Sequence, residues 1–197
     1  MAVKAVIFDL DGTITQPYFD FDAIREEMGL SRDAGPVWEA MEKMTPQQRR
    51  RCEVILHFHE QKAMAQSKLN VGAKKTLIAL RRKGIKVGVL TRNRRSNANG
   101  VAKKHGLQFD AVIGREEGPV KPDAFGVLSL CQLFLVNPSE TLVVGDYLFD
   151  VQCARAAGAG AVLLTNHKEL NEFGEDADFT IDKLEKILEI IEIKNST

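Results

Sequence analysis

The sequence feature that most limits the possible folds is a series of short apolar runs, rich in β-branched residues. The runs cover residues 5–8, 85–90, 111–113, 142–144, 161–164 and 179–181. Between them lie segments of helical character at residues 73–83, 96–105, 123–136 and 150–157, and another, residues 183–193, follows the last run. Strand-length runs that alternate with helices are typical of a mainly parallel sheet. We therefore predict an α/β fold, a Rossmann-like sheet with helices on both faces.

One segment, residues 16–69, interrupts this alternation, because it contains no strand-like run and shows helical periodicity instead. A turn through Gly35 and Pro36 divides it, and Pro46 suits the first turn of a helix that begins after Thr45. The expected helices cover residues 21–28, 37–44 and 46–66. The sequence thus predicts a discontinuous core, residues 1–15 and 70–197, with a small helical cap, residues 16–69, inserted after the first strand.

The composition is that of an ordinary globular protein. Of the 197 residues, 44% are hydrophobic and 27% are charged, which is enough to bury the core of one domain with a modest insertion. No run approaches the roughly 18 apolar residues that a membrane-spanning helix needs, and no signal-like segment begins the chain. We therefore expect a soluble, cytoplasmic protein without a membrane partner.

The spacing of cysteine and histidine argues against a disulfide framework and against a zinc site. Cys52, Cys131 and Cys153 lie 79 and 22 residues apart, which matches neither pattern, so we expect three reduced thiols. The histidines also lack the spacing of metal ligands. We expect packing or surface roles for all of them, that is, for His57, His59, His105 and His167.

The net charge of zero conceals an uneven distribution of charge along the chain. Residues 61–109 contain 13 Lys or Arg and no Asp or Glu, whereas residues 140–192 contain 12 acidic and 4 basic residues. One interpretation is that these are solvated helix faces. The other is a field that draws anionic ligands toward one side of the molecule. Because the chain as a whole is not basic, we do not expect a nucleic-acid partner.

Polar side chains follow three of the predicted strands at their carboxyl ends. Asp9 and Asp11 follow the first, Thr91 follows the second, and Asp146 and Asp150 follow the fourth. A single Asp after a strand often only caps a turn or a helix. In an open parallel sheet, however, the carboxyl ends meet at one edge, where ligands bind. Carboxylates gathered there need a counter-charge, and their hard oxygen atoms suit Mg²⁺, so we predict a magnesium site.

These residues belong to four short motifs that occur in order along the chain. The motifs are Asp9-Leu10-Asp11-Gly12-Thr13, Thr91 after a buried strand, Lys121-Pro122-Asp123, and Gly145-Asp146 with Asp150 four residues later. Together they resemble the motifs of the haloacid dehalogenase superfamily. The inserted helices resemble the cap of its phosphoglycolate phosphatase-like subgroup. The resemblance spans the whole predicted core and implies phosphoryl transfer through an aspartyl-phosphate.

The resemblance implies a distinct role for each residue of the first motif. Asp9 is expected to attack phosphorus as a nucleophile, which splits one difficult displacement into two steps. Asp11 is expected to protonate the leaving oxygen and later to deprotonate the attacking water, because two nearby carboxyl groups cannot both ionise easily. Gly12 and Thr13 are expected to bind substrate, since they let the loop turn so that backbone N–H groups approach the phosphate.

The second and third motifs are expected to hold the phosphoryl group. By resemblance, Thr91 donates a hydrogen bond to a phosphoryl oxygen, and Lys121 neutralises the charge shared between Asp9 and that oxygen. Arg92 and Asn93 follow Thr91 and are candidates for a substrate-binding rim around the phosphate. A solvated start of the next helix is the other interpretation of these two residues.

The fourth motif is expected to complete the magnesium site. By resemblance, Asp146 coordinates Mg²⁺ directly, together with Asp9 and the backbone carbonyl of Asp11. Asp150 is expected to orient the ligands from the outer shell. The predicted metal residues are therefore Asp9, Asp11, Asp146 and Asp150.

Asp11 also separates the activities that occur within this superfamily. Dehalogenases and phosphonatases lack an acid two residues after the nucleophile, and phosphate-pumping ATPases need membrane helices. A phosphomutase retains both aspartates and stays open as an alternative. So does a non-catalytic phosphoacceptor of the receiver type, although there the acids of the first strand are adjacent. We expect a phosphoric monoester hydrolase that acts on a small phosphorylated metabolite, phosphoglycolate-like or related, and we leave the oligomeric state open.

Overall fold

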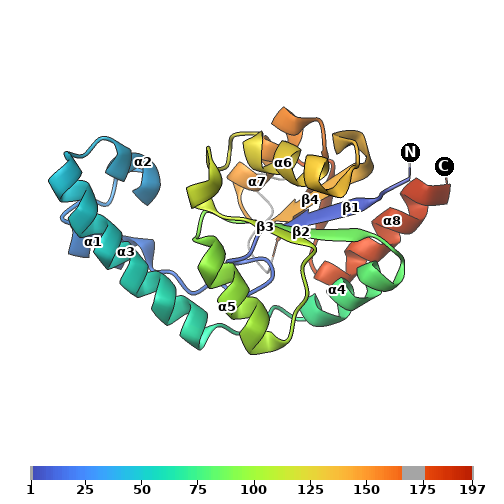
Figure 1. Cartoon of the computed structure of the whole chain (residues 1–197), viewed down its shortest axis with the longest axis horizontal. Helices are drawn as coiled ribbons and strands as arrows, with labels where there is room; N and C mark the ends of the chain where they lie inside the picture. The colour runs from blue at the N-terminus through green and yellow to red at the C-terminus, as the bar shows by residue number, and fades with distance from the viewer. Residues whose placement is uncertain (1, 166–175, 197) are drawn as a thin grey trace. The chain divides into compact units, whose positions relative to one another are not determined.

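The computed structural model describes residues 2–165 and 176–196, so His167 lies outside the described part of the chain. Within that part, one parallel sheet has the strand order β3-β2-β1-β4-β5-β6 (Figure 1). The strands are β1 (Ala5–Phe8), β2 (Lys86–Leu90), β3 (Ala111–Ile113), β4 (Thr141–Gly145), β5 (Gly160–Leu164) and β6 (Phe179–Ile181). The predicted α/β class is confirmed.

Helices cover both faces of the sheet, as Figure 1 shows. On one face lie α4 (Ala73–Arg82), α5 (Arg95–His105) and α8 (Ile187–Ser196), and on the other lie α6 (Phe125–Phe134) and α7 (Leu148–Ala157). Side chains of a strand alternate between the two faces. Ala5 and Ile7 accordingly pack in one cluster with Val127, Leu130 and Val151 of α6 and α7. A sheet covered on both faces explains why its strands are almost continuously apolar.

The register of the three central strands brings the predicted site residues to one edge. At the carboxyl end of β1, Phe8 lies opposite Val89 of β2 and Val144 of β4. Asp9 follows Phe8 directly, while Thr91 and Asp146 come two residues after the two partners of Phe8. The loops that carry the first, second and fourth motifs therefore begin side by side.

Several element boundaries differ from the prediction for local reasons. β2 starts one residue later than predicted, because the Ile85 N–H donates to the carbonyl of Leu80 and completes the turn after α4. α6 starts after residue 123 because the Asp123 carboxylate accepts from the Phe125 N–H, an Asx turn that precedes the helix. The last helix starts later than predicted, after the 3-10 turn Leu184–Lys186.

The chain forms two compact units, of which the sheet unit comprises Met1–Pro17 and Lys68–Thr197. The other unit, Tyr18–Ser67, contains α1 (Phe21–Met28), α2 (Val37–Glu42) and α3 (Pro46–Gln66). The prediction placed the insertion at residues 16–69. A capping box between Thr45 and Gln48, with Pro46 at the first position, starts α3. The apolar cluster of this unit consists of Ile24, Val37, Met41, Cys52 and Leu56.

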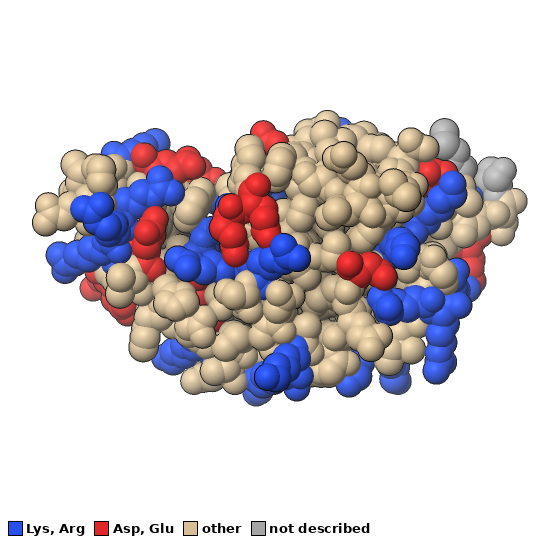
Figure 2. All heavy atoms as spheres, in the orientation of Figure 1, with Lys and Arg blue, Asp and Glu red and all other residues tan. Residues whose placement is uncertain are grey.

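Cations of the basic stretch at residues 61–109 pair with carboxylates from other parts of the sheet unit. Arg81 contacts Asp110, and Arg95 contacts Glu117, each with an N–O distance of 3.0 Å. In Figure 2 the Lys and Arg side chains of the visible face occur in separate groups, several of them beside Asp or Glu. The arrangement favours the interpretation of this stretch as a solvated surface. No helix of the described ranges combines the length and apolarity needed to span a membrane.

The three cysteines are buried free thiols. Burial raises the pKa of each of them, that of Cys153 to about 12. The thiolate is the reactive form, and at pH 8 only on the order of 10⁻⁴ of Cys153 is ionised. We expect iodoacetamide to leave the native chain unmodified and to add three groups in denaturant, as measured by intact mass. Rapid labelling of the native chain would show that the thiols are accessible.

Candidate active site

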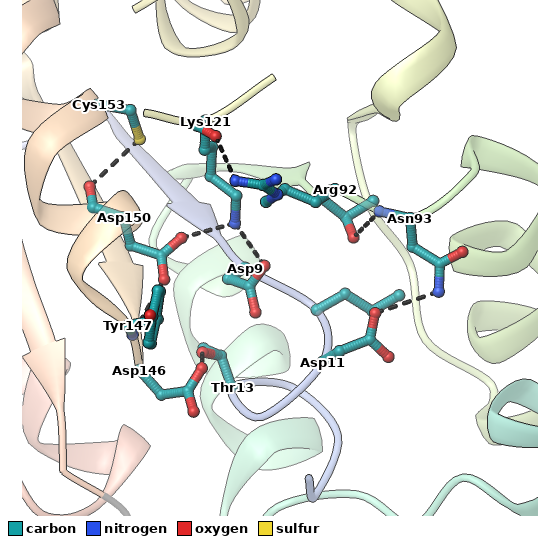
Figure 3. A network of polar contacts seen from close by, with 12 residues as sticks. Asp9, Asp11, Thr13, Arg92, Asn93, Lys121, Asp146, Tyr147, Asp150 and Cys153 are labelled. Atoms are coloured by element: carbon teal, nitrogen blue, oxygen red, sulfur yellow. Dashed lines mark hydrogen bonds and ion pairs between the residues drawn. The ribbon is translucent and has the colours of Figure 1, made fainter. Parts of the chain in front are cut away.

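A buried lysine lies between two carboxylates at the centre of the site (Figure 3). Asp9 directly follows β1, Asp150 lies in the first turn of α7, and Lys121 comes from the loop before α6. The Lys121 Nζ lies 2.5 Å from Asp9 Oδ1 and 2.6 Å from Asp150 Oδ1. Lys121 is 4% exposed and Asp150 is 3% exposed, so water screens these pairs little. The predicted contact between Lys121 and Asp9 is present, and Asp150 is an additional partner.

The charges of this cluster shift its titration in a consistent direction. Burial raises the pKa of Asp9 well above its ordinary value, Lys121 opposes that rise, and the other carboxylates reinforce it. Burial on its own would lower the pKa of the Lys121 ammonium, but Asp150 and Asp9 outweigh burial and raise the pKa. Lys121 therefore stays charged, and without a further cation it faces more negative charge than it can balance.

Asp146 completes the acidic cluster. Carboxylate oxygens of Asp9, Asp146 and Asp150 lie within 4.8 Å of one another, and all three residues are buried. One lysine against three carboxylates leaves an excess of two negative charges when all are ionised. Hard oxygen donors with that excess charge fit a divalent cation such as Mg²⁺. The Asp11 carboxylate lies outside this cluster, and the prediction assigned only the backbone carbonyl of Asp11 to the metal.

The loop after β1 approaches Asp146 so closely that only glycine fits. Gly12 has φ +100°, and a Cβ there would lie 2.5 Å from Asp146 Oδ2. The Thr13 hydroxyl donates to Asp146 Oδ1 at 3.5 Å. Asn70 holds the loop from outside, because its Nδ2 donates to the carbonyls of Gly12 at 3.0 Å and Thr13 at 2.8 Å. The prediction that this loop turns sharply is consistent with these contacts, but it overlooked Asn70.

A second glycine makes room for Asp150. A Cβ on Gly145 would lie 2.0 Å from the carboxyl carbon of Asp150, so the carboxylate occupies the space that a side chain would fill. The other carboxylate oxygen, Oδ2, accepts from the Tyr147 N–H at 3.2 Å. Both oxygens of Asp150 therefore have donors within the chain. Its orienting role toward a metal stays a prediction.

On the other side of the site, residues after β2 contact Asp11 rather than the metal cluster. The Asn93 N–H donates to the Thr91 hydroxyl oxygen at 3.0 Å, so the Thr91 O–H can point its proton toward a ligand. The Asn93 side chain donates from Nδ2 to Asp11 Oδ2 at 3.2 Å. Figure 3 shows Asp11 turned toward Asn93 and away from Asp146. The two aspartates of the first motif thus have separate surroundings.

The comparisons with known proteins agree with this geometry. The family profile of haloacid dehalogenase-like hydrolases matches residues 3–158. The chain belongs to this family. Its curated relatives include a provisionally named pyrophosphatase of Clostridium perfringens, 30% identical over 98% of this chain and 100% of the relative. Another is a phosphoglycolate phosphatase of Chromobacterium violaceum, 26% identical over 96% of each.

Solved structures support the haloacid dehalogenase fold for nearly the whole chain. A hydrolase from Pseudomonas syringae superposes with a TM-score of 0.82 at 20% identity, covering 96% of this chain and 98% of that one. This likeness concerns the fold. The family profile and the curated relatives confirm the expected resemblance and the expected hydrolase of the haloacid dehalogenase type.

Within this haloacid dehalogenase-like site, Arg92 links three loops. Its guanidinium donates from Nη1 to the Lys121 carbonyl at 2.8 Å and lies over the Phe149 ring, with Cζ 4.6 Å from the centroid. Tyr147 packs edge-on against Phe149, and Arg115 donates to the Arg92 carbonyl at 3.3 Å. The sequence suggested a phosphate rim at Arg92. The structure shows its guanidinium on the Lys121 carbonyl, and the phosphate contact stays a prediction.

The structure brings most of the predicted residues together and adds others. Asp9, Lys121, Asp146 and Asp150 form one contact network, while Asp11, Thr91 and Asn93 form a second network beside it. Sequence reasoning overlooked three residues that support these networks from behind, namely Asn70, Asn97 and Arg115. None of the three lies in a motif.

Proposed function

We propose that this haloacid dehalogenase-like hydrolase is a Mg²⁺-dependent phosphatase that hydrolyses a small phosphate monoester through an aspartyl-phosphate on Asp9. The observation that carries the proposal is the separation of two aspartates two residues apart. Asp9 contacts Lys121 and belongs to the acidic cluster, whereas Asp11 accepts a hydrogen bond from Asn93 on the other side. This separation supports Asp9 as the nucleophile and Asp11 as the acid and base.

In the first step, an Asp9 carboxylate oxygen attacks phosphorus and forms a new O–P bond. The bond between phosphorus and the ester oxygen breaks, and its electron pair stays on the leaving oxygen. Asp11, as a carboxylic acid, gives its proton to that oxygen, so an alcohol departs. Lys121, in contact with Asp9, neutralises negative charge shared between the nucleophile and a phosphoryl oxygen.

In the second step, water hydrolyses the phosphoenzyme. Asp11, now a carboxylate, takes a proton from the water as its oxygen attacks phosphorus. The bond between phosphorus and Asp9 breaks, and its electrons return to the Asp9 carboxylate. Phosphate leaves, Asp11 is again protonated, and the net change is an ester and water becoming an alcohol and phosphate.

The metal and phosphate contacts follow from the residues around these two aspartates. Asp9, Asp146 and the Asp11 carbonyl would hold Mg²⁺, with Asp150 orienting them. The bound cation supplies neutralisation of phosphoryl charge. The Thr91 hydroxyl and the backbone N–H groups of Thr13 and Arg92 would bind phosphoryl oxygens. The close contact between Gly12 and Asp146 supports this metal site, because it holds the Asp146 carboxylate against the loop that follows Asp9.

The substrate class is a small phosphorylated metabolite. Relatives named phosphoglycolate phosphatase and pyrophosphatase act, by their names, on small anionic phosphates, which favours a phosphoglycolate-like ester here. We place the enzyme in the cytoplasm, with no nucleic acid or membrane as its partner. A phosphomutase would share both aspartates and would transfer the phosphoryl group to a second hydroxyl instead of water.

The proposal predicts Mg²⁺-dependent release of inorganic phosphate from a simple aryl phosphate. We expect activity with Mg²⁺, none in chelator, and recovery when Mg²⁺ is added back. In Asp11→Asn, an ester whose leaving group needs no proton should still phosphorylate Asp9. Hydrolysis of the resulting phosphoenzyme should be slower by about 10²-fold or more, because the water then lacks its base. Rapid-quench measurement of phosphoprotein and free phosphate separates the steps. Full activity in chelator, or equal loss in both steps, would contradict the mechanism.

A further inference from the structure

Asn93 has a side-chain amide whose orientation is fixed by its neighbours. Its Oδ1 accepts from Asn97 Nδ2 at 2.8 Å and from the Arg94 N–H at 2.7 Å. An oxygen with two donors must be the carbonyl end of the amide, because an NH₂ group cannot accept. Its Nδ2 therefore points the other way, and it donates to Asp11 Oδ2 at 3.2 Å.

Both asparagines are buried although neither fills an apolar core. Asn93 is 7% exposed and Asn97, in the first turns of α5, is 1% exposed. A buried amide destabilises a fold unless its polar atoms are satisfied, so such residues are retained where their hydrogen bonds serve a purpose. Here the hydrogen bonds form a directional chain from Asn97 through Asn93 to Asp11.

We propose that Asn97 and Asn93 together are a positioning device for the acid and base Asp11. The hydrogen bond occupies Oδ2 of Asp11 and fixes the plane of the carboxyl group. That plane sets the direction in which Asp11 gives a proton to the leaving oxygen and takes one from the water. Asn97 acts one step further away, because it holds the Asn93 amide in the orientation that donates. The inference rests on the proposed role of Asp11 as acid and base.

The geometry separates this role from phosphate binding. The contact of Asn93 with Thr91 is made by its backbone N–H, so a change of the Asn93 side chain leaves it in place. An effect on Asp11 also depends on the leaving group, since only a poor leaving group needs a proton. A lost phosphate contact would slow all esters alike.

Asn93→Asp is the sharpest test because it keeps the size and shape of the side chain. In its ionised form the new carboxylate can still accept from Asn97 and Arg94, but it has no proton to donate to Asp11 and instead accepts the proton that Asp11 carries. We expect kcat/KM for aryl phosphates with poor leaving groups to fall at least about tenfold, and that for the most acidic phenol to change less than about threefold. Asn97→Ala should give the same pattern more weakly. Asn99→Asp is the matched control, since Asn99 is exposed on the same helix.

The kcat value adds a second signature. For the ester with the most acidic phenol, kcat should fall although kcat/KM does not, because hydrolysis of the phosphoenzyme still needs Asp11. Equal losses across the leaving-group series, or none, would overturn the positioning role. Thermal unfolding of each variant shows whether a loss of activity arises from misfolding. If Asn93→Asp does not fold, the leaving-group dependence of Asn97→Ala tests the positioning role. A wild-type chain that releases phosphate from no ester would overturn the proposed function, and this inference with it.

Discussion

Replacing Asp9 with asparagine is expected to reduce phosphate release by at least about a thousandfold, because the amide cannot attack phosphorus. The replacement has nearly the same shape, and the Asp9 N–H keeps its 2.8 Å hydrogen bond to the Val144 carbonyl. The loss should appear in kcat, and rapid-quench experiments should detect no phosphoprotein. In the wild type, the phosphoryl group should be found on the peptide that contains Asp9.

The stability of Asp9→Asn should distinguish a lost nucleophile from a damaged fold. A carboxyl group whose pKa is raised in the folded state destabilises that state once it ionises, at pH values above its ordinary pKa. Asparagine does not ionise, so the destabilisation that comes from burying a charged Asp9 among other carboxylates is absent. In chelator at neutral pH, the variant should therefore unfold at the same denaturant concentration as the wild type or higher. A folded Asp9→Asn protein, free of contaminating phosphatase, that retained turnover would contradict the assignment.

The gathering of site residues at one edge of the sheet could be predicted from the sequence, because it depends only on strand order and on the residues that follow each strand. Asp9, Thr91 and Asp146 each follow an apolar run closely, and parallel strands in register bring such residues together. The separate surroundings of the Asp9 and Asp11 side chains could not be predicted in this way. They depend on the turn at Gly12, where φ is positive and the loop packs against Asp146.

Residues that act through another residue leave little trace in a sequence. Asn97 resembles any polar residue of an amphipathic helix, and Asn70 lies in an ordinary turn before α4. Their roles depend on the hydrogen bonds that they donate. Asn97 donates to the Asn93 side-chain oxygen, and Asn70 donates to carbonyls of the loop after β1. For Arg92 the sequence suggested a phosphate contact, which stays a prediction, but it gave no sign that the guanidinium also donates to the Lys121 carbonyl.

Replacing Lys121 with methionine should remove activity and destabilise the fold. Methionine has a similar length without the charge, so Asp9 and Asp150 would remain buried beside each other with no cation between them. Removing one partner of a buried ion pair destabilises a protein by about 3–5 kcal/mol. We expect a loss of that size in urea unfolding measured in chelator. Activity should fall at least about a hundredfold, because phosphoryl charge is no longer neutralised.

Lys83→Met is the matched control for this stability measurement. Lys83 pairs with Glu192 at 3.0 Å, but the two side chains are 45% and 64% exposed. An exposed pair contributes less than about 1 kcal/mol, so this variant should unfold nearly like the wild type and keep full activity. Equal effects of the two substitutions would show that the Lys121 pairs are solvated and contribute no more than a surface contact.

A double variant tests whether charge imbalance causes the destabilisation. In Lys121→Met the buried carboxylates repel one another, and proton uptake by the folded state relieves this, so the loss of stability should be smaller in acidic than in neutral buffer. Asp9→Asn removes one of the charges, and in combination with Lys121→Met it should restore part of the stability that the single change removes. If the two changes were simply additive, the loss would come from packing around the lysine stem, and Asp9 would not be the charge that Lys121 holds in place.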